Sequence, residues 1–444
     1  MENQEPSSST PHRISNWLRK SLLVKLGSIG FLVLLLMLPN AMIRELITER
    51  QFRQSEAIRS VSQSWGAPQR IIGPVLSIPF TSWVQQDDGK KTALKQTAHF
   101  LPSLLDIDGG IDHQIRQKGI YDVILYQSEL QIRGTFLRPD FTTMQVQPED
   151  VHWDQAKLSL GISGMTGIKN TINLDWGGQE LRMEPGTAYP ALLSSGVSIG
   201  VPLNVPTESY AFSIPLTVKG SDFLEFEPVG KETKVSLKSG WPSPSFEGAF
   251  LPDPREVKAD GFTASWQILD LNRNYPQSWK NETFHFGESA FGVRLVKPVD
   301  EYLKNERSAK YAILVIGLTF LIYFFFAVLR KFHIHPFQDF LVGLALSVFY
   351  LLLLSLSEQI GFDMAYLAAS VATVGLIAGY SASFLKSTML TIQLTLLLAL
   401  IYGFIFIVLQ LEDYALLAGS VGIFAALAAV MYYSRRVDWY RIGE

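Results

Sequence analysis

The residues best suited to chemistry are carboxylates in a proline-rich stretch, WPSPSFEGAFLPDPRE, at residues 241–256. It holds Glu247, Asp253 and Glu256, and carboxylates can serve as general acids and bases. Proline removes a backbone donor and fixes φ, so four prolines here exclude a helix interior and a central strand. The stretch is therefore either a catalytic loop or a rigid joint between strands, and we favour the joint.

As a joint, this stretch needs anchors in the core and a solvated surface. The side chains predicted to anchor it are Trp241, Phe246 and Phe250. The side chains predicted to form a solvated rim are Glu247, Asp253, Arg255 and Glu256. Rigid exposed loops often carry recognition, so binding by this rim is a second interpretation.

Other chemical patterns are missing from the sequence. His333 and His335 form the one close pair among the seven histidines, and a metal site would need a third ligand. There is no cysteine, no Gly-rich phosphate loop and no G-x-S-x-G motif. We therefore predict no enzymatic activity, no catalytic residues, no cofactor and no metal. An enzyme that acts on envelope polymers through dispersed carboxylates remains an alternative.

The elements that must position these residues begin with membrane helices. Hydrophobic residues make up 48% of the 444-residue chain and charged residues only 18%. A spanning helix needs about 20 mostly apolar residues. The runs that meet this length lie at residues 26–43, 311–329, 337–357, 364–385, 388–409 and 414–433. The predicted fold class is a membrane protein with one N-terminal and five C-terminal transmembrane helices around a large all-β, sandwich-like domain.

Charged residues near the spans predict the orientation. Lys and Arg lie in both terminal segments and in the short loops on the same side of the membrane, which predicts that both termini are cytoplasmic. The short loops on the opposite side, SEQIGFD and LED, contain neither residue. The long middle segment is then periplasmic. The predicted domains are a cytoplasmic tail (1–25), transmembrane helix 1 (26–43), a helical stalk (44–65), a periplasmic β domain (66–308), a five-helix membrane bundle (309–433) and a cytoplasmic tail (434–444).

The middle segment changes from helical to strand periodicity after the stalk. Trp65 closes the apolar stripe of the stalk, and Gly66 begins the turn, so both are candidate structural or interaction residues. Beyond them, apolar residues alternate with polar ones in KLSLGIS, NTINLDW, AFSIPLTVKG and GFTASWQIL. This alternation, broken by Gly, Pro and Asp turns, is typical of half-buried antiparallel strands in a sandwich.

The candidate polar residues of the membrane segments are three carboxylates: Asp339, Glu358 and Asp363. Ionisable residues within membrane spans often mark transport pathways. All three lie near the predicted ends of spans, and no span carries a charge at its centre. This distribution argues against an ion-coupled pump, while a transporter or channel component remains an alternative function.

Several motifs together resemble the CreD family of bacterial inner-membrane proteins. They are LITER, SWGAPQRIIGP, SGWPSPSFEGAFLPDPREVKADGFTASW, LNRNYPQSW and PVDEYLKNERSAKYAILVIGLTF. The resemblance implies a stress-responsive role in cell-envelope integrity, linked to tolerance of colicins and antibiotics, and it brings no catalytic residues. The β domain is then expected to act as a scaffold, sensor or interaction module.

The partners to expect are the lipid bilayer and envelope proteins or polymers. The net charge of −3 gives no indication of nucleic-acid binding. The oligomeric state is not predicted.

Overall fold

The computed structural model describes residues 22–85, 91–203, 207–281, 284–297, 301–329, 334–411 and 414–435. The predicted N-terminal tail lies outside the described residues up to residue 21, and the predicted C-terminal tail lies outside them from residue 436. The chain divides into two compact units, the first of residues 1–53 with 299–444 and the second of residues 54–298.

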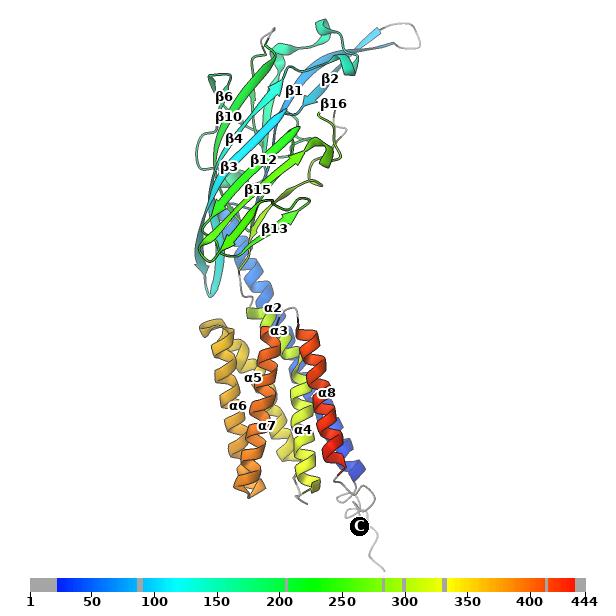
Figure 1. The fold of residues 1–444 in the computed structure, drawn as a ribbon, viewed down its shortest axis with the longest axis vertical. Coiled ribbons are helices and arrows are strands. Elements are labelled where there is room, and N and C mark those ends of the chain that lie inside the picture. Colours follow the sequence, from blue (N-terminus) through cyan, green and yellow to red (C-terminus); the bar gives the residue numbers. More distant parts are fainter. Residues whose placement is uncertain are drawn as a thin grey trace, which may run out of the picture. The chain divides into compact units, whose positions relative to one another are not determined.

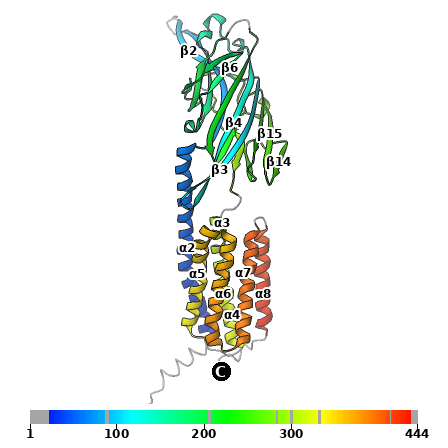
Figure 2. The ribbon, with the colours of Figure 1, turned by 90° about the vertical axis from the view of Figure 1, so that its left-hand side faces the viewer.

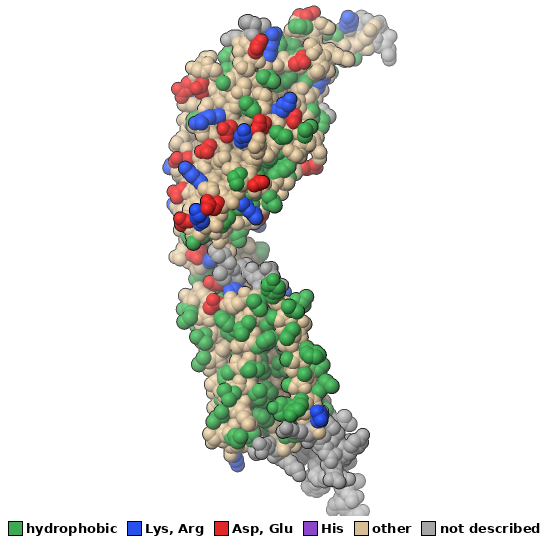
Figure 3. Space-filling view, viewed as in Figure 1, with side chains coloured by type: hydrophobic (Ala, Val, Ile, Leu, Met, Phe, Trp, Pro, Cys, Tyr) green, Lys and Arg blue, Asp and Glu red, His purple; other side chains and the backbone are tan. Residues whose placement is uncertain are grey.

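The first unit contains six helices that are long and apolar enough to cross a membrane, as predicted. The long helices lie side by side, and a short helix, α3, lies at one end of the bundle (Figure 2). Their bounds are α2 (Leu22–Trp65), α3 (Glu301–Lys310), α4 (Ala312–Leu329), α5 (Pro336–Ile360), α6 (Phe362–Leu385), α7 (Thr388–Gln410) and α8 (Ala415–Ser434). Hydrophobic side chains cover the visible face of these helices, whereas charged side chains gather on the β unit (Figure 3).

Local signals explain where the helices start and stop. Pro336 occupies the first turn of α5, where its missing N–H costs nothing, and His335 accepts a hydrogen bond from the Phe337 amide. Gly361 separates α5 from α6 with φ of 78°, a conformation that glycine adopts without strain. Ser387 caps the start of α7.

The second unit consists of two stacked sheets (Figure 1). Sheet A contains β13 (Pro244–Gly248), β17 (Phe291–Leu295), β11 (Phe223–Phe226), β1 (Gln69–Gln85), β5 (Lys157–Ile162), β9 (Gly196–Gly200), β8 (Glu184–Pro185), β2 (Lys91–Phe100) and β16 (Ser278–Lys280). Sheet B runs β14 (Arg255–Lys258), β15 (Gly261–Leu269), β12 (Glu232–Ser239), β3 (Leu104–Lys118), β4 (Tyr121–Leu137), β10 (Ser209–Ser221), β6 (Asn173–Trp176) and β7 (Gln179–Arg182). This arrangement confirms the predicted all-β domain of sandwich type.

Alternation along the strands builds one core between the sheets. On β3, Leu105, Ile107 and Ile111 are buried, while Asp106 and Asp108 face outward. Most strand pairs are antiparallel, but β1 pairs with β11 and β12 pairs with β3 in parallel. These parallel pairs join segments distant in the sequence, which alternation alone does not identify.

One boundary differs from the sequence-based expectations. The strands end at Leu295, and residues 301–308, placed in the predicted β domain, belong to the helix α3 instead. The segment EYLKNERSAK is rich in helix-forming residues and lacks a period of two.

Candidate functional site

The predicted residues Trp65 and Gly66 attach the end of α2 to sheet B. The Trp65 ring lies between two cations, with the Arg116 guanidinium carbon 4.1 Å and the Lys219 ammonium 4.0 Å from its centroid. Its indole N–H donates to the Tyr126 carbonyl at 3.3 Å. A side chain at Gly66 would meet the Lys219 carbonyl oxygen at 2.4 Å. Both positions therefore serve close packing of the helix end.

The stretch at 241–256 carries the chain from one sheet to the other. It contributes β13 to the edge of sheet A and β14 to the edge of sheet B, so its prolines avoid the central strands. Trp241 is 5% exposed, and its indole N–H reaches the carbonyls of Ser243 and Val296 at 3.0 and 3.1 Å. Phe246 and Phe250 pack partly buried against the core.

The charged residues of this stretch do not behave alike. Arg255 and Glu256 are exposed on β14, and Arg255 lies 5.9 Å from the Phe246 ring centroid. The Glu247 side chain is partly exposed, as expected for a rim residue, but it also belongs to an ion-paired cluster on the outer face of sheet A. The pairing of β13 with β17 sets Glu247 next to Arg294.

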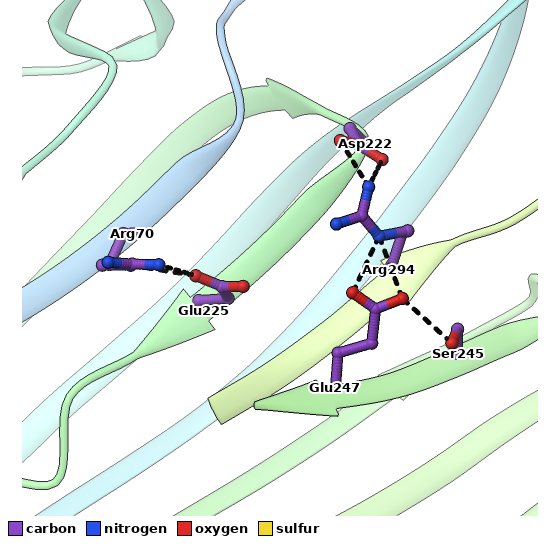
Figure 4. Close-up of polar contacts among 6 residues, drawn as sticks. All are labelled: Arg70, Asp222, Glu225, Ser245, Glu247 and Arg294. Atoms are coloured by element: carbon purple, nitrogen blue, oxygen red, sulfur yellow. Dashed lines mark hydrogen bonds and ion pairs between the residues drawn. The ribbon is translucent and has the colours of Figure 1, made fainter. Parts of the chain in front are cut away.

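Arg294 is the centre of that cluster (Figure 4). Its Nε donates to both Glu247 oxygens at 3.0 and 2.9 Å, and its Nη1 donates to both Asp222 oxygens at 2.8 and 2.9 Å. Ser245 adds a hydrogen bond to Glu247 at 3.1 Å. Burial alone would lower the pKa of Arg294, but the two carboxylates raise it above its usual value.

A second ion pair continues the same face. Arg70 on β1 donates to one Glu225 oxygen on β11 at 2.6 and 2.9 Å. Burial raises the pKa of Asp222 against the opposing effect of Arg294. Because the guanidinium groups and carboxylates of this cluster bond to one another, the arrangement fixes the strands β1, β11, β13 and β17 together and leaves little charge for a ligand.

The interior near sheet A contains an ionisable side chain that the sequence did not single out. His99 on β2 is fully buried, its Nδ1 is 2.8 Å from the Ser77 hydroxyl, and its ring contacts those of Tyr189 and Trp279. Burial lowers its pKa to about 4, so the imidazole is neutral at pH 7. The described contacts of His99 include no carboxylate that could orient the ring as a catalytic base.

The motif LNRNYPQSW builds a second buried polar group. Glu227 is 1% exposed, and the Tyr275 hydroxyl donates to it at 3.3 Å. The Arg273 guanidinium stacks 4.3 Å from the Tyr275 ring centroid and donates to the carbonyls of Tyr275 and Val229. Burial raises the pKa values of Glu227 and Tyr275 and lowers that of Arg273. These bonds bind a loop to the core.

The three carboxylates of the membrane segments lie at helix ends. Glu358 is 13% exposed, accepts a hydrogen bond from the Tyr302 hydroxyl at 2.9 Å and lies 3.8 Å from Arg50. Asp363 accepts a hydrogen bond from Gln410 at 2.6 Å.

Lys304 on α3 lies 3.6 Å from Asp363 on α6. This ion pair and the hydrogen bond from Tyr302 to Glu358 attach α3 to the bundle. Asp339 lies half-buried in the first turn of α5, where the helix dipole favours a negative charge.

No metal centre is formed by the described residues, which hold no group of three or more potential His, Cys, Asp or Glu ligands. His335 caps α5, and His333 lies outside the described residues.

A large open site lies on the outer face of sheet B. A groove of about 950 Å³ crosses strands β14, β15, β12, β3, β4 and β10. The charged side chains that line it are Asp108, Asp112, Glu129, Lys238, Glu256, Lys258 and Asp260. We call it the sheet B groove. Five carboxylates and two ammonium groups give it an acidic excess.

Glycine creates the hollow at the centre of the groove. Gly110 on β3 pairs with Glu129 on β4 and with Lys238 on β12. A Cβ at Gly110 would have only the Lys238 side chain within 4 Å, at 3.8 Å. Its neighbour Gly109 faces the core, where a Cβ would meet the Leu130 side chain at 2.4 Å. One glycine thus opens the outer face, and the other allows close packing underneath.

The sheet B groove was missed in the sequence, although a signal existed. In LLDIDGGIDHQ, Asp106, Asp108 and Asp112 occupy the polar phase of the alternation, with glycine at the remaining outward position. Lining side chains such as Gln127, Gln131, Thr217 and Thr263 add hydrogen-bonding groups. The groove can therefore bind a polar partner that supplies donors or positive charge.

Similarity to known proteins extends over both units. A family model described as inner membrane protein CreD matches residues 21–440. The inner membrane protein CreD of Escherichia coli (strain K12) is 33% identical over 432 residues, which cover 95% of this chain and 95% of that protein. The match thus includes the β domain as well as the membrane helices.

Proposed function

Because the chain belongs to the CreD family of inner membrane proteins, we propose that it supports cell-envelope integrity as a non-enzymatic, membrane-anchored interaction protein. The membrane helices anchor it. The β domain lies in the periplasm and binds an envelope protein or polymer through the sheet B groove. The single observation that carries this proposal is the groove itself, a large acidic hollow on a folded face.

The chemistry of the groove supports recognition more than turnover. Its lining has carboxylates, amides, hydroxyls and two lysines, and it contains no histidine. Glu256 and Lys258 pair at 2.8 Å. Of the remaining charged groups, the carboxylates of Asp108, Asp112 and Glu129 on β3 and β4 outnumber the one ammonium, that of Lys238. A partner with amines or many hydroxyl and amide donors would complement this surface.

The orientation is part of the proposal and has its own test. The short loops SEQIGFD and LED lack Lys and Arg, which favours their placement outside. A reporter enzyme that is active only in the periplasm is expected to be active when fused after Asp413 and inactive when fused after Arg436. The reverse pattern would exclude a periplasmic β domain.

A groove-blocking substitution tests the function. Gly110→Trp places a large ring in the hollow without meeting backbone atoms within 4 Å of its Cβ. We expect the variant to be present in the membrane at normal levels but to fail to complement the envelope phenotype of a deletion strain.

The matched control is Arg133→Trp, which adds the same ring on an exposed position of β4 outside the groove lining. It is expected to complement. Full complementation by a stable Gly110→Trp protein would refute the role of the groove.

A further inference from the structure

The membrane unit has an apolar groove of its own, at its edge. It has a volume of about 330 Å³ and lies between α4, α7 and α8. Its lining includes Tyr311, Leu314, Phe404, Val408, Gly419 and Ile423. We call it the α8 groove. These positions fall at the start of α4, the end of α7 and the start of α8, so they share one end of the bundle (Figure 1).

Two glycines of α8 explain why the groove is open. At Gly422, a Cβ would meet the Phe404 ring at 2.2 Å, so the ring fills that position and brings α7 and α8 together. At Gly419, one turn earlier, a Cβ would meet nothing within 4 Å. The helices are thus in close contact at one glycine and separated at the other. Ile423, which is 55% exposed, borders the opening.

The rim of the groove carries a lysine and a tyrosine side by side in the sequence. Lys310 ends α3 and Tyr311 follows it, a pair typical of the membrane–water boundary. The Lys310 ammonium is 2.8 Å from Glu306, and its side chain is 52% exposed. An ammonium has three donors, so the bond to Glu306 leaves further donors for an anion.

We propose that the α8 groove binds an acyl chain of an anionic phospholipid whose phosphate lies at Lys310. The groove lining is almost wholly apolar, which suits an acyl chain, and the exposed Lys310 ammonium lies on the same rim. An ammonium and a phosphate form charge-assisted hydrogen bonds. The groove supplies both parts of such a ligand site: an apolar channel and a cation at the depth of the headgroups.

Native mass spectrometry of the intact protein in detergent tests this site, with phosphatidylglycerol or phosphatidylcholine added. The wild-type protein is expected to retain one phosphatidylglycerol in preference to phosphatidylcholine. Gly419→Leu fills the groove and is expected to weaken that binding by about tenfold or more, the effect of losing a few methylene contacts. Gly403→Leu is the control, because Gly403 also has open space but lies outside the groove.

The headgroup contact is tested separately, so the proposal does not depend on one variant folding. Lys310→Gln is expected to remove the preference for phosphatidylglycerol, whereas Lys386→Gln, at the opposite end of the bundle, is expected to keep it. Equal phosphatidylglycerol binding by wild type and Gly419→Leu, or an unchanged preference in Lys310→Gln, would overturn the proposal. A Gly419→Leu protein with altered oligomeric state and unaltered lipid binding would also overturn it, in favour of a second copy at the groove.

Discussion

The two sheets of the β domain place their charged side chains in opposite ways. On sheet A, Arg294 is held between Asp222 and Glu247 (Figure 4). The His99 side chain of the same sheet is fully buried. On the described strands of sheet B, no Asp, Glu, Lys, Arg or His is buried. Their carboxylates instead surround a groove in which acidic groups outnumber basic ones.

The difference separates charges that hold the fold from charges that remain for a partner. A guanidinium that bonds to two carboxylates has used most of its donors, and its removal leaves those carboxylates unpaired. Carboxylates beside a glycine hollow keep their acceptors for water or a ligand. We therefore expect substitutions on sheet A to change stability and substitutions in the sheet B groove to change function.

The comparison assumes that both sheets depend on one core, and Trp241 gives the strongest test. Trp241→Ala removes a buried ring at the passage between the sheets and is expected to cost about 3–5 kcal/mol of unfolding free energy. Urea unfolding of the intact protein in detergent, followed by tryptophan fluorescence, measures this loss. Seven of the nine tryptophans lie between residues 65 and 279, so the signal reports mainly on the β domain.

Trp83 is the matched control for that measurement. It lies on β1 with a hydrogen bond to Asp150 at 2.9 Å, but it is 55% exposed. Trp83→Ala is expected to cost less than about 1 kcal/mol. Similar losses for both variants would mean that Trp241 does not secure a shared core.

The buried histidine of sheet A, His99, predicts a pH dependence of stability. The pKa of His99 is lowered from 6.5 to about 4 in the folded protein, so the unfolded chain takes up the proton first. The contribution of neutral His99 to the unfolding free energy is complete above pH 6.5 and is lost as the pH falls to about 4. The loss amounts to about 3 kcal/mol.

His99→Gln provides the comparison, because the amide can still bond to Ser77 but does not titrate. The wild-type unfolding free energy is expected to fall more steeply than that of the variant between pH 6.5 and 4. Parallel curves for the two proteins would show that protonation of His99 does not lower the unfolding free energy.

Arg294 tests the ion-paired face directly. Arg294→Gln leaves Asp222 and Glu247 without their shared partner, and we expect a loss of about 1–2 kcal/mol, limited because the cluster is partly exposed. In a double-mutant cycle with Glu247→Gln, the coupling is expected to be about 0.5–1 kcal/mol. Arg133→Gln on the exposed face of β4 should change stability by less than about 0.5 kcal/mol. A coupling of zero would place Arg294 among ordinary surface charges.

Much of this fold could be predicted from sequence because its signals are local. The apolar runs that give α4 to α8 each lie within one helix, and the alternation in AFSIPLTVKG lies within β10. The family also follows from contiguous motifs. None of these predictions requires knowledge of which strands are neighbours.

The candidate site could not be predicted because it depends on pairing between distant strands. Glu247 meets Arg294 only because β13 pairs with β17, and Lys238 reaches Gly110 only through the parallel pair of β12 and β3. The ion pairs of the partly exposed Glu247 were missed for this reason. The burial of Trp241, by contrast, could be predicted from the hydrophobicity of its side chain alone.

The smallest expected effect on stability gives the sharpest test of the comparison. Glu129→Gln in the sheet B groove and Glu247→Gln on sheet A are the same chemical change on opposite faces. Glu129 is exposed beside Gly110, so replacing it with the neutral Gln should alter the unfolding free energy by less than about 0.5 kcal/mol.

The charge of Glu129, however, belongs to the acidic excess that would attract a partner. Combined with Asp108→Asn, it is expected to abolish complementation of the envelope phenotype while the melting curve stays unchanged. Glu247→Gln should weaken the fold and, at normal protein levels, retain complementation. If the two variants exchange these outcomes, the paired face of sheet A is the functional surface and the sheet B groove is only a polar exterior.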